Sequence, residues 1–119
     1  MNNQMENELG KVVISEELLS TLAGVAAVEC YGLVGMASRK LSDGIAELLG
    51  KDNLSKGVEA KLEGELLTVN LYIIVSYGTK IPEVAVNVME KVKYTLEQFT
   101  GLTVSAVNVF VQGVRVVDK

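Results

Sequence analysis

The chain has 119 residues, of which 49% are hydrophobic and 22% charged, and this composition is typical of one globular domain with a single core. Its net charge at pH 7 is −4, with only eleven lysines and arginines spread along the sequence. Nucleic-acid binding requires basic side chains that neutralise phosphates, so we expect no nucleic-acid partner.

The N-terminal residues do not have the pattern of a signal peptide. Residues 1–9 are polar and acidic, and we expect them to form a flexible N-terminal tail ahead of a single domain over residues 10–117. No apolar run in the sequence reaches the roughly 20 residues that span a bilayer. The single cysteine, Cys30, fits a reducing interior, so we expect a cytoplasmic protein without a membrane span.

A strand and a helix are predicted at the start of the domain. Residues 11–14 form a short apolar run that predicts a first strand. Ser15 is suited to the N-cap of a helix over residues 16–30, because its hydroxyl can accept a backbone hydrogen bond and two glutamates follow it. Gly32 is suited to the end of this helix.

The connection over residues 33–57 contains a shorter helical pattern. Four apolar residues recur at helical spacing and predict an amphipathic helix, namely Leu41, Ile45, Leu48 and Leu49. Its polar residues mix both charge signs, which does not suit an anionic bilayer. We expect this helix to pack on its own domain, and we keep it as a candidate partner-docking helix.

Alternation of apolar and polar residues predicts a hairpin of two strands. The alternation runs over residues 58–63 and again over residues 66–76, and Glu63-Gly64-Glu65 predicts a tight connection between them. One face of the second strand is wholly apolar and is expected to be buried: Leu67, Val69, Leu71, Ile73 and Val75.

A long helix and a final strand are predicted in the last third. The helix begins near Ile81, with Pro82 in its first turn, and ends at Gly101. Its apolar stripe consists of Ile81, Val84, Ala85, Val88, Met89, Val92, Leu96 and Phe99. Residues 102–111 then predict a strand, with a bulge or bend at Gly113.

The predicted elements follow the order strand, helix, strand, strand, helix, strand. This β-α-β-β-α-β order is typical of a ferredoxin-like α+β fold, a two-layer sandwich with two helices on one face of a mainly antiparallel sheet. The short amphipathic helix lies in the connection over residues 33–57. Nothing in the sequence indicates a second domain or an internal repeat.

The residue types exclude several kinds of catalytic and metal site. The sequence has no histidine and one cysteine, so it can form neither a Ser-His-Asp or Cys-His arrangement nor a zinc site of several Cys and His ligands. We interpret Cys30, at the end of the first helix, as a small buried hydrophobe. Paired glutamates fall where solvent would reach them, and the glycines form no phosphate-binding loop. We therefore expect no enzymatic activity, no cofactor and no metal.

The sheet face without helices is the most informative candidate site. It is expected to carry alternate residues of the second hairpin strand and one parity of the last strand, either Val104, Ala106 and Phe110 or Val107, Val109 and Val111. Asn108 stands out inside this valine strand, either bonding a backbone group or lying on the contact face. An exposed apolar patch usually marks a partner surface. The candidate interaction surface consists of Leu66, Tyr72, Ile74, Asn108 and Phe110.

The order and spacing of several short segments resemble the alkaline shock protein family of bacterial envelope-stress proteins. The matching segments are residues 14–15, 23–26, 31–32, 57–58, 69–75, 77–84, 101–102 and 107–114. The resemblance covers about residues 10–117. It implies a cytoplasmic protein of cell-envelope homeostasis, peripheral at the membrane through a partner, and it supplies no catalytic residues. Short members of this family are often encoded beside a fatty-acid kinase, which implies a lipid-metabolism kinase as a partner.

Two functions are compatible with these observations. The first is a non-enzymatic interaction or scaffold protein of the envelope stress response, which forms a homo-oligomer through the apolar sheet face. The alternative is a small-ligand- or lipid-linked regulatory module that partners a fatty-acid-kinase-type enzyme.

Overall fold

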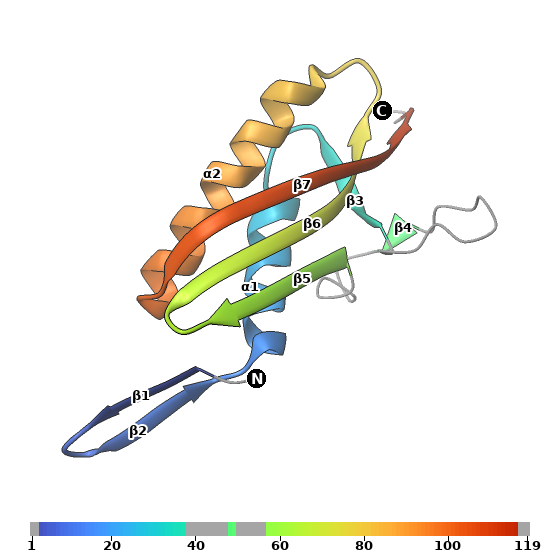
Figure 1. Ribbon diagram of the computed structural model, residues 1–119. Coiled ribbons are helices and arrows are strands. Elements are labelled where there is room, and N and C mark those ends of the chain that lie inside the picture. Colours follow the sequence, from blue (N-terminus) through green and yellow to red (C-terminus); the bar gives the residue numbers. More distant parts are fainter. Residues whose placement is uncertain (1–2, 38–47, 50–56, 117–119) are drawn as a thin grey trace.

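The computed structural model describes residues 3–37, 48–49 and 57–116 of the chain. In chain order its elements are β1 (Asn3–Asn7), β2 (Gly10–Ile14), α1 (Glu16–Val28), β3 (Leu33–Ala37), β4 (Leu48–Leu49), β5 (Val58–Glu63), β6 (Leu66–Ser76), α2 (Ile81–Thr100) and β7 (Thr103–Arg115). Strands β3 to β7 form one five-stranded sheet, and both helices lie on the same face of it (Figure 1). The predicted α+β fold class, with two helices on a mainly antiparallel sheet, is confirmed.

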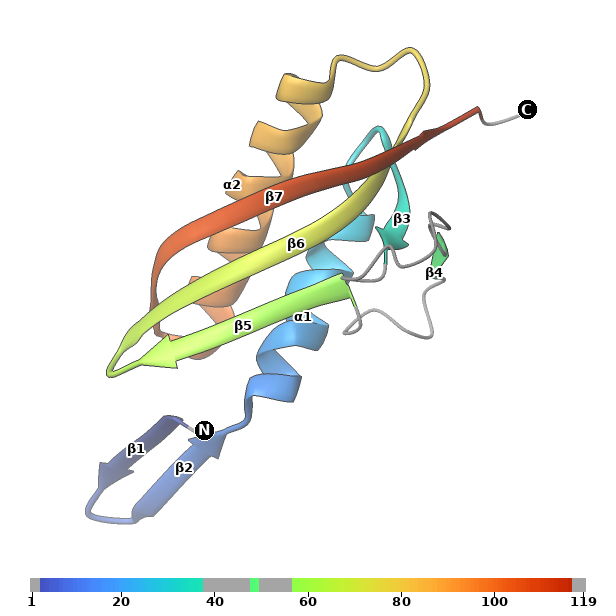
Figure 2. The same cartoon turned by 45° about the vertical axis from the view of Figure 1, so that its right-hand side comes forward.

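The N-terminal residues form a hairpin that projects away from this sheet (Figures 1 and 2). In its turn, the Leu9 N–H donates to Asn7 Oδ1 at 2.8 Å. Two predictions are corrected here. The predicted tail over residues 1–9 contains β1, and the predicted first strand over residues 11–14 pairs with β1 instead of joining the helix-covered sheet. β1 was not predicted because its segment is mostly polar. A tight turn brings it beside β2, and pairing through backbone hydrogen bonds requires no apolar pattern in the sequence.

Helix α1 begins at the predicted cap, where Ser15 Oγ accepts the Leu18 N–H at 3.1 Å. Its buried side is made mostly of small residues: Leu19, Ser20, Ala23, Gly24, Ala26 and Ala27. These small side chains allow α1 to lie close to α2, which it contacts. Leu18, by contrast, exposes 47% of its surface and lies outside the buried side of the helix.

Strand β3 occupies a place in the sheet where no strand was predicted. β5 pairs with residues 66–71 of β6, and β3 pairs antiparallel with residues 73–75, farther along the same edge. β4 then pairs with β3 through Leu48 and Leu49. The predicted docking helix is therefore wrong at these two leucines, because backbone pairing to β3 takes them into a strand. Leu41 and Ile45 lie outside the described residues.

Hairpin β5–β6 and helix α2 agree with their predictions. Gly64 turns the hairpin with a φ of 63°, and Gly101 ends α2 with a φ of 76° while its N–H donates to the Glu97 carbonyl. The buried stripe of α2 comprises Val84, Val88, Val92, Leu96 and Thr100. The i+4 spacing of this stripe leads from Val84 to Thr100, so two residues of the predicted stripe are exposed instead of buried: Ile81 exposes 39% of its surface and Phe99 74%.

Strand β7 runs parallel to β6, as expected for two strands joined by the crossover helix α2. The register shifts by one residue after Val104, which leaves Ser105 as the extra residue. A second shift lies beside Gly113, where a bulge or bend was predicted. The first shift decides which parity faces the helices: Val107, Val109 and Val111 pack against the core.

Candidate interaction surface

The face of the sheet opposite the helices, called the open face below, is defined by residues on β5, β6 and β7. Alternation along β6 places Leu67, Val69, Leu71, Ile73 and Val75 in the core under the helices. The remaining β6 residues lie on the other side with their neighbours in the ladder. The open face comprises Glu59, Lys61, Glu63, Leu66, Thr68, Asn70, Tyr72, Ala106, Asn108 and Phe110.

A row of hydrogen-bonded polar side chains crosses three strands of the open face. Asn70 is directly opposite Glu59 on one side and Asn108 on the other. Asn108 Nδ2 donates to Asn70 Oδ1 at 2.9 Å, and Asn70 Nδ2 donates to Glu59 Oε1 at 3.2 Å. The position of Asn108 inside a valine strand is thereby explained: its amide bonds a side chain across the ladder, not an edge or turn backbone.

An aromatic pair lies beside this polar row. Tyr72 and Phe110 are opposite each other in the register and stack with ring centroids 4.9 Å apart and an interplanar angle of 14°. The Tyr72 hydroxyl also donates to Glu59 Oε1 at 3.1 Å, which ties the pair to the polar row. Cross-strand contacts of these kinds stabilise a sheet and hold its side chains in fixed positions.

The structure places four of the five predicted surface residues on the exposed part of this face. Leu66 exposes 52% of its surface and Phe110 42%, Asn108 is exposed, and Tyr72 is half-buried. The prediction is wrong for Ile74, which is only 2% exposed. Alternation gives the side of the sheet on which a residue lies, but it does not show what covers that residue.

The open face is more polar than the sequence predicted. Glu59, which lies on the polar side of the alternation over residues 58–63, accepts hydrogen bonds from Asn70 and Tyr72. Thr68 and Ser105 add a hydroxyl pair with their oxygens 3.1 Å apart. The signal that could have identified Glu59 is the hairpin register, since a tight turn at Gly64 places Glu59 opposite Asn70.

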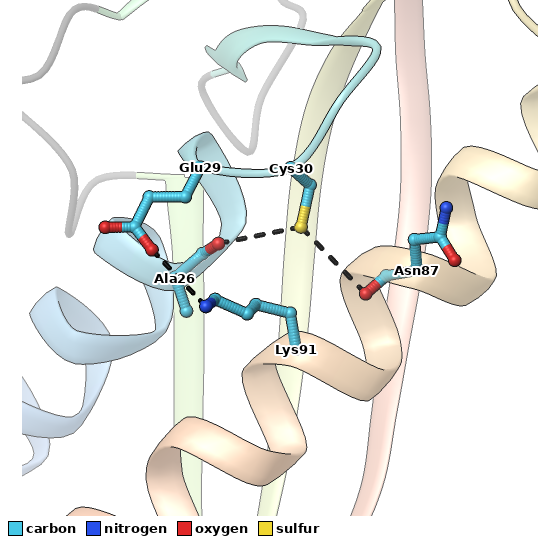
Figure 3. Close-up of polar contacts among 5 residues, drawn as sticks. All are labelled: Ala26, Glu29, Cys30, Asn87 and Lys91. Carbon is cyan, nitrogen blue, oxygen red and sulfur yellow. Dashed lines mark hydrogen bonds and ion pairs between the residues drawn. The ribbon is translucent and has the colours of Figure 1, made fainter.

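Cys30 lies between the two helices and not on the open face (Figure 3). Its Sγ is 3.6 Å from the Ala26 carbonyl oxygen and 3.9 Å from the Asn87 carbonyl oxygen. Burial raises the pKa of the Cys30 thiol above its usual value, and the positive charge of Lys91 opposes this effect. The thiol is therefore protonated at neutral pH, as an inert packing residue would be.

The acidic residues that the structure describes do not gather into a metal site. Glu16 and Glu17 lie in the first turn of α1, where the helix dipole favours negative charge. They line a surface depression of about 430 Å³ together with Glu59 and Lys61. In the parts of the chain that the structure describes, no three His, Cys, Asp or Glu side chains are grouped to hold an ion.

Comparison with solved structures supports the fold. The zinc form of the D249N variant of the MamM CTD has a TM-score of 0.52 and 14% sequence identity, covering 87% of this chain and 90% of that one. At this identity the likeness concerns the arrangement of helices and strands alone. Among the described helices, none is long and apolar enough to cross a membrane.

Comparison with known sequences identifies the family. The uncharacterized protein YloU of Bacillus subtilis (strain 168) is 52% identical over 119 residues, which covers 99% of both chains. The uncharacterized protein Spy1614 of Streptococcus pyogenes serotype M6 is 40% identical over 120 residues, covering 100% of this chain and 99% of that protein. The model of the alkaline shock protein 23 family, described as having a cell envelope-related function, matches residues 4–116. The chain therefore belongs to the alkaline shock protein 23 family, as the resemblance of its sequence predicted.

Proposed function

We propose that this member of the alkaline shock protein family is a non-enzymatic interaction protein of cell-envelope homeostasis that self-associates through its open face. The observation that carries the proposal is the stacked pair of Tyr72 and Phe110, which stays partly exposed although both residues are aromatic. Large aromatic side chains are enriched at the centres of protein interfaces, where they supply apolar area in fixed positions.

The polar residues of the open face also suit a protein contact. Covering a polar group is costly when it loses its hydrogen bonds to water without finding others. Here Asn70 already bonds Glu59 and Asn108, and Tyr72 bonds Glu59 as well. These groups therefore keep hydrogen bonds to each other when a partner covers them. Leu66 and Phe110 supply apolar contact area.

Absence of enzymatic activity is part of the same proposal. The sequence contains no histidine, which is the commonest general base in enzymes. Its one thiol is held protonated between the helices, away from the open face. A cytoplasmic location, with membrane association through a protein partner, completes the proposal.

Sedimentation velocity over a wide range of protein concentrations tests the self-association. We compare the wild-type chain with Phe110→Asp and with the matched control Leu18→Asp. Leu18 has a similar exposed fraction, 47% against 42%, but lies on α1 on the far side of the sheet. We expect the wild type and Leu18→Asp to associate equally, and Phe110→Asp to associate at least roughly tenfold more weakly, since a buried unpaired charge opposes contact.

Two outcomes would contradict the proposal. One is a wild-type chain that stays monomeric at the highest concentrations. The other is a folded Phe110→Asp variant, verified by its thermal unfolding, that associates as strongly as the wild type.

A further inference from the structure

The outer edge of β7 is the longest strand edge that the structure describes. β7 has 13 residues, and among the described residues it pairs with β6 alone. In Figures 1 and 2 it forms the outer margin of the sheet on the side of α2. At its start the Val104 N–H donates to Glu97 Oε2 at 3.0 Å, so a side chain of α2 bonds the first part of this edge.

The two outer edges of the sheet differ in charge. β5 carries Glu59, Lys61 and Glu63 within its six residues, and charged side chains of this kind protect an edge against pairing with another chain. The sequence of β7 from Thr103 to Val114 has no charged residue and no proline. The unpaired backbone groups of a β-edge are complementary to an extended strand, so β7 is suited to receive one.

A groove between α2 and β7 runs beside this free edge. It is lined by Met89, Glu90 and Lys93 of α2 and by residues 104–107 of β7. Glu90 and Lys93 are one helical turn apart and both exposed. Together with Glu97, which bonds the start of β7, two acidic side chains and one basic side chain of α2 therefore accompany the edge.

We infer that the edge pairs with the β7 of a second copy of this chain, antiparallel and about a twofold axis. The strand is uncharged from Thr103 to Val114, so the two strands themselves bring no like charges together, and the strand of the second copy replaces Glu97 at the Val104 N–H. In this arrangement the axis passes beside residues 104–107, next to the groove, and sets the two α2 helices antiparallel to each other. Glu90 of each copy then lies against Lys93 of the other, which gives two equivalent opposite-charge contacts in one self-complementary interface.

The inference rests on the proposed self-association but uses a different surface. Antiparallel pairing about such an axis continues one sheet across both copies, with both open faces on the same side. The edge contact thus leaves the open face uncovered and doubles the area it can present to a further partner.

Charge exchange between the two helix positions tests the arrangement by sedimentation velocity. Glu90→Lys and Lys93→Glu each place like charges across the axis, and we expect each to weaken dimer formation by roughly tenfold. The double variant E90K/K93E restores both opposite-charge contacts, so we expect it to associate like the wild type. Glu8→Lys is the matched control, because it makes the same charge change at an exposed position of the N-terminal hairpin, away from β7 and from the open face, and should leave association unaltered.

Single variants that associate normally would overturn the inference, as would a double variant no stronger than the singles. Thermal unfolding at low concentration checks that each monomer remains folded. The edge contact and the open-face contact are tested separately. If the charge variants at Glu90 and Lys93 associate like the wild type while Phe110→Asp associates more weakly, the edge contact is rejected and the open-face contact is kept. The reverse pattern keeps the edge and rejects the open face.

Discussion

The two faces of β6 differ in burial and in the kind of side chain they carry. Leu67, Val69, Leu71, Ile73 and Val75 lie under the helices with no exposed surface. On the opposite side, Thr68, Asn70 and Tyr72 bond or stack with neighbouring strands and stay partly exposed. The comparison shows that only one face of β6 contributes to the core under the helices, while side chains of the other face remain accessible.

The largest expected effect is the loss of a core side chain on the covered side. Leu71→Ala removes buried methyl groups and leaves a cavity, so we expect the free energy of unfolding to fall by about 2–5 kcal/mol. Leu66→Ala on the same strand is the matched control, and a half-exposed site should lose less than about 1 kcal/mol. Urea denaturation measures both variants. Equal decreases in the free energy of unfolding for the two variants would contradict the distinction between a buried and an exposed face of β6.

Gly32 provides a second test of packing on the covered side, where α1 turns into β3. A Cβ added to Gly32 would lie 2.7 Å from Val84 Cγ2, and the residue has a φ of 90°. We expect Gly32→Ala to destabilise the protein by about 2–3 kcal/mol, from steric overlap as well as backbone strain.

Gly64→Ala separates those two causes in the same unfolding measurement. Gly64 also has a positive φ, of 63°, but no atom lies within 4 Å of its added Cβ. Only the backbone strain remains, about 1 kcal/mol. A Gly32→Ala variant as stable as Gly64→Ala would show that the space beside Val84 can relax.

The smallest effect concerns Cys30, which lies in the helix layer. Because burial raises the pKa of its thiol, the folded state keeps the proton while the unfolded chain ionises near its ordinary value of 9.0. The thiol therefore contributes stability below that pH, and the contribution is lost as pH rises above it. We expect alkylation by iodoacetamide at mildly alkaline pH to be slower in the folded protein than in urea. Equal rates would contradict a protected thiol.

Sequence reasoning succeeded where local signals decide the structure. The Ser15 cap, the turn at Gly64 and the stop at Gly101 each depend on neighbouring residues, and all three are confirmed. The burial of one β6 face followed from simple alternation.

The remaining features depend on contacts between distant segments. β3 forms because β5 leaves part of the β6 edge unpaired, and no periodicity in Leu33–Ala37 reveals this. The parity of β7 depends on the extra residue Ser105, which moves Val107 onto the core side. Four of the five predicted surface residues are exposed or half-exposed, but the bonding of Glu59 to Asn70 required the strand register.

The most direct test of self-association through the open face is a dilution series followed by amide NMR spectra. With increasing concentration, we expect the largest shift changes at open-face residues, including Tyr72, Asn108 and Phe110, and little change at Leu18 and Val25 on the outer side of α1. Changes concentrated on α1 with an unaffected Phe110 would contradict the account, as would spectra that do not depend on concentration.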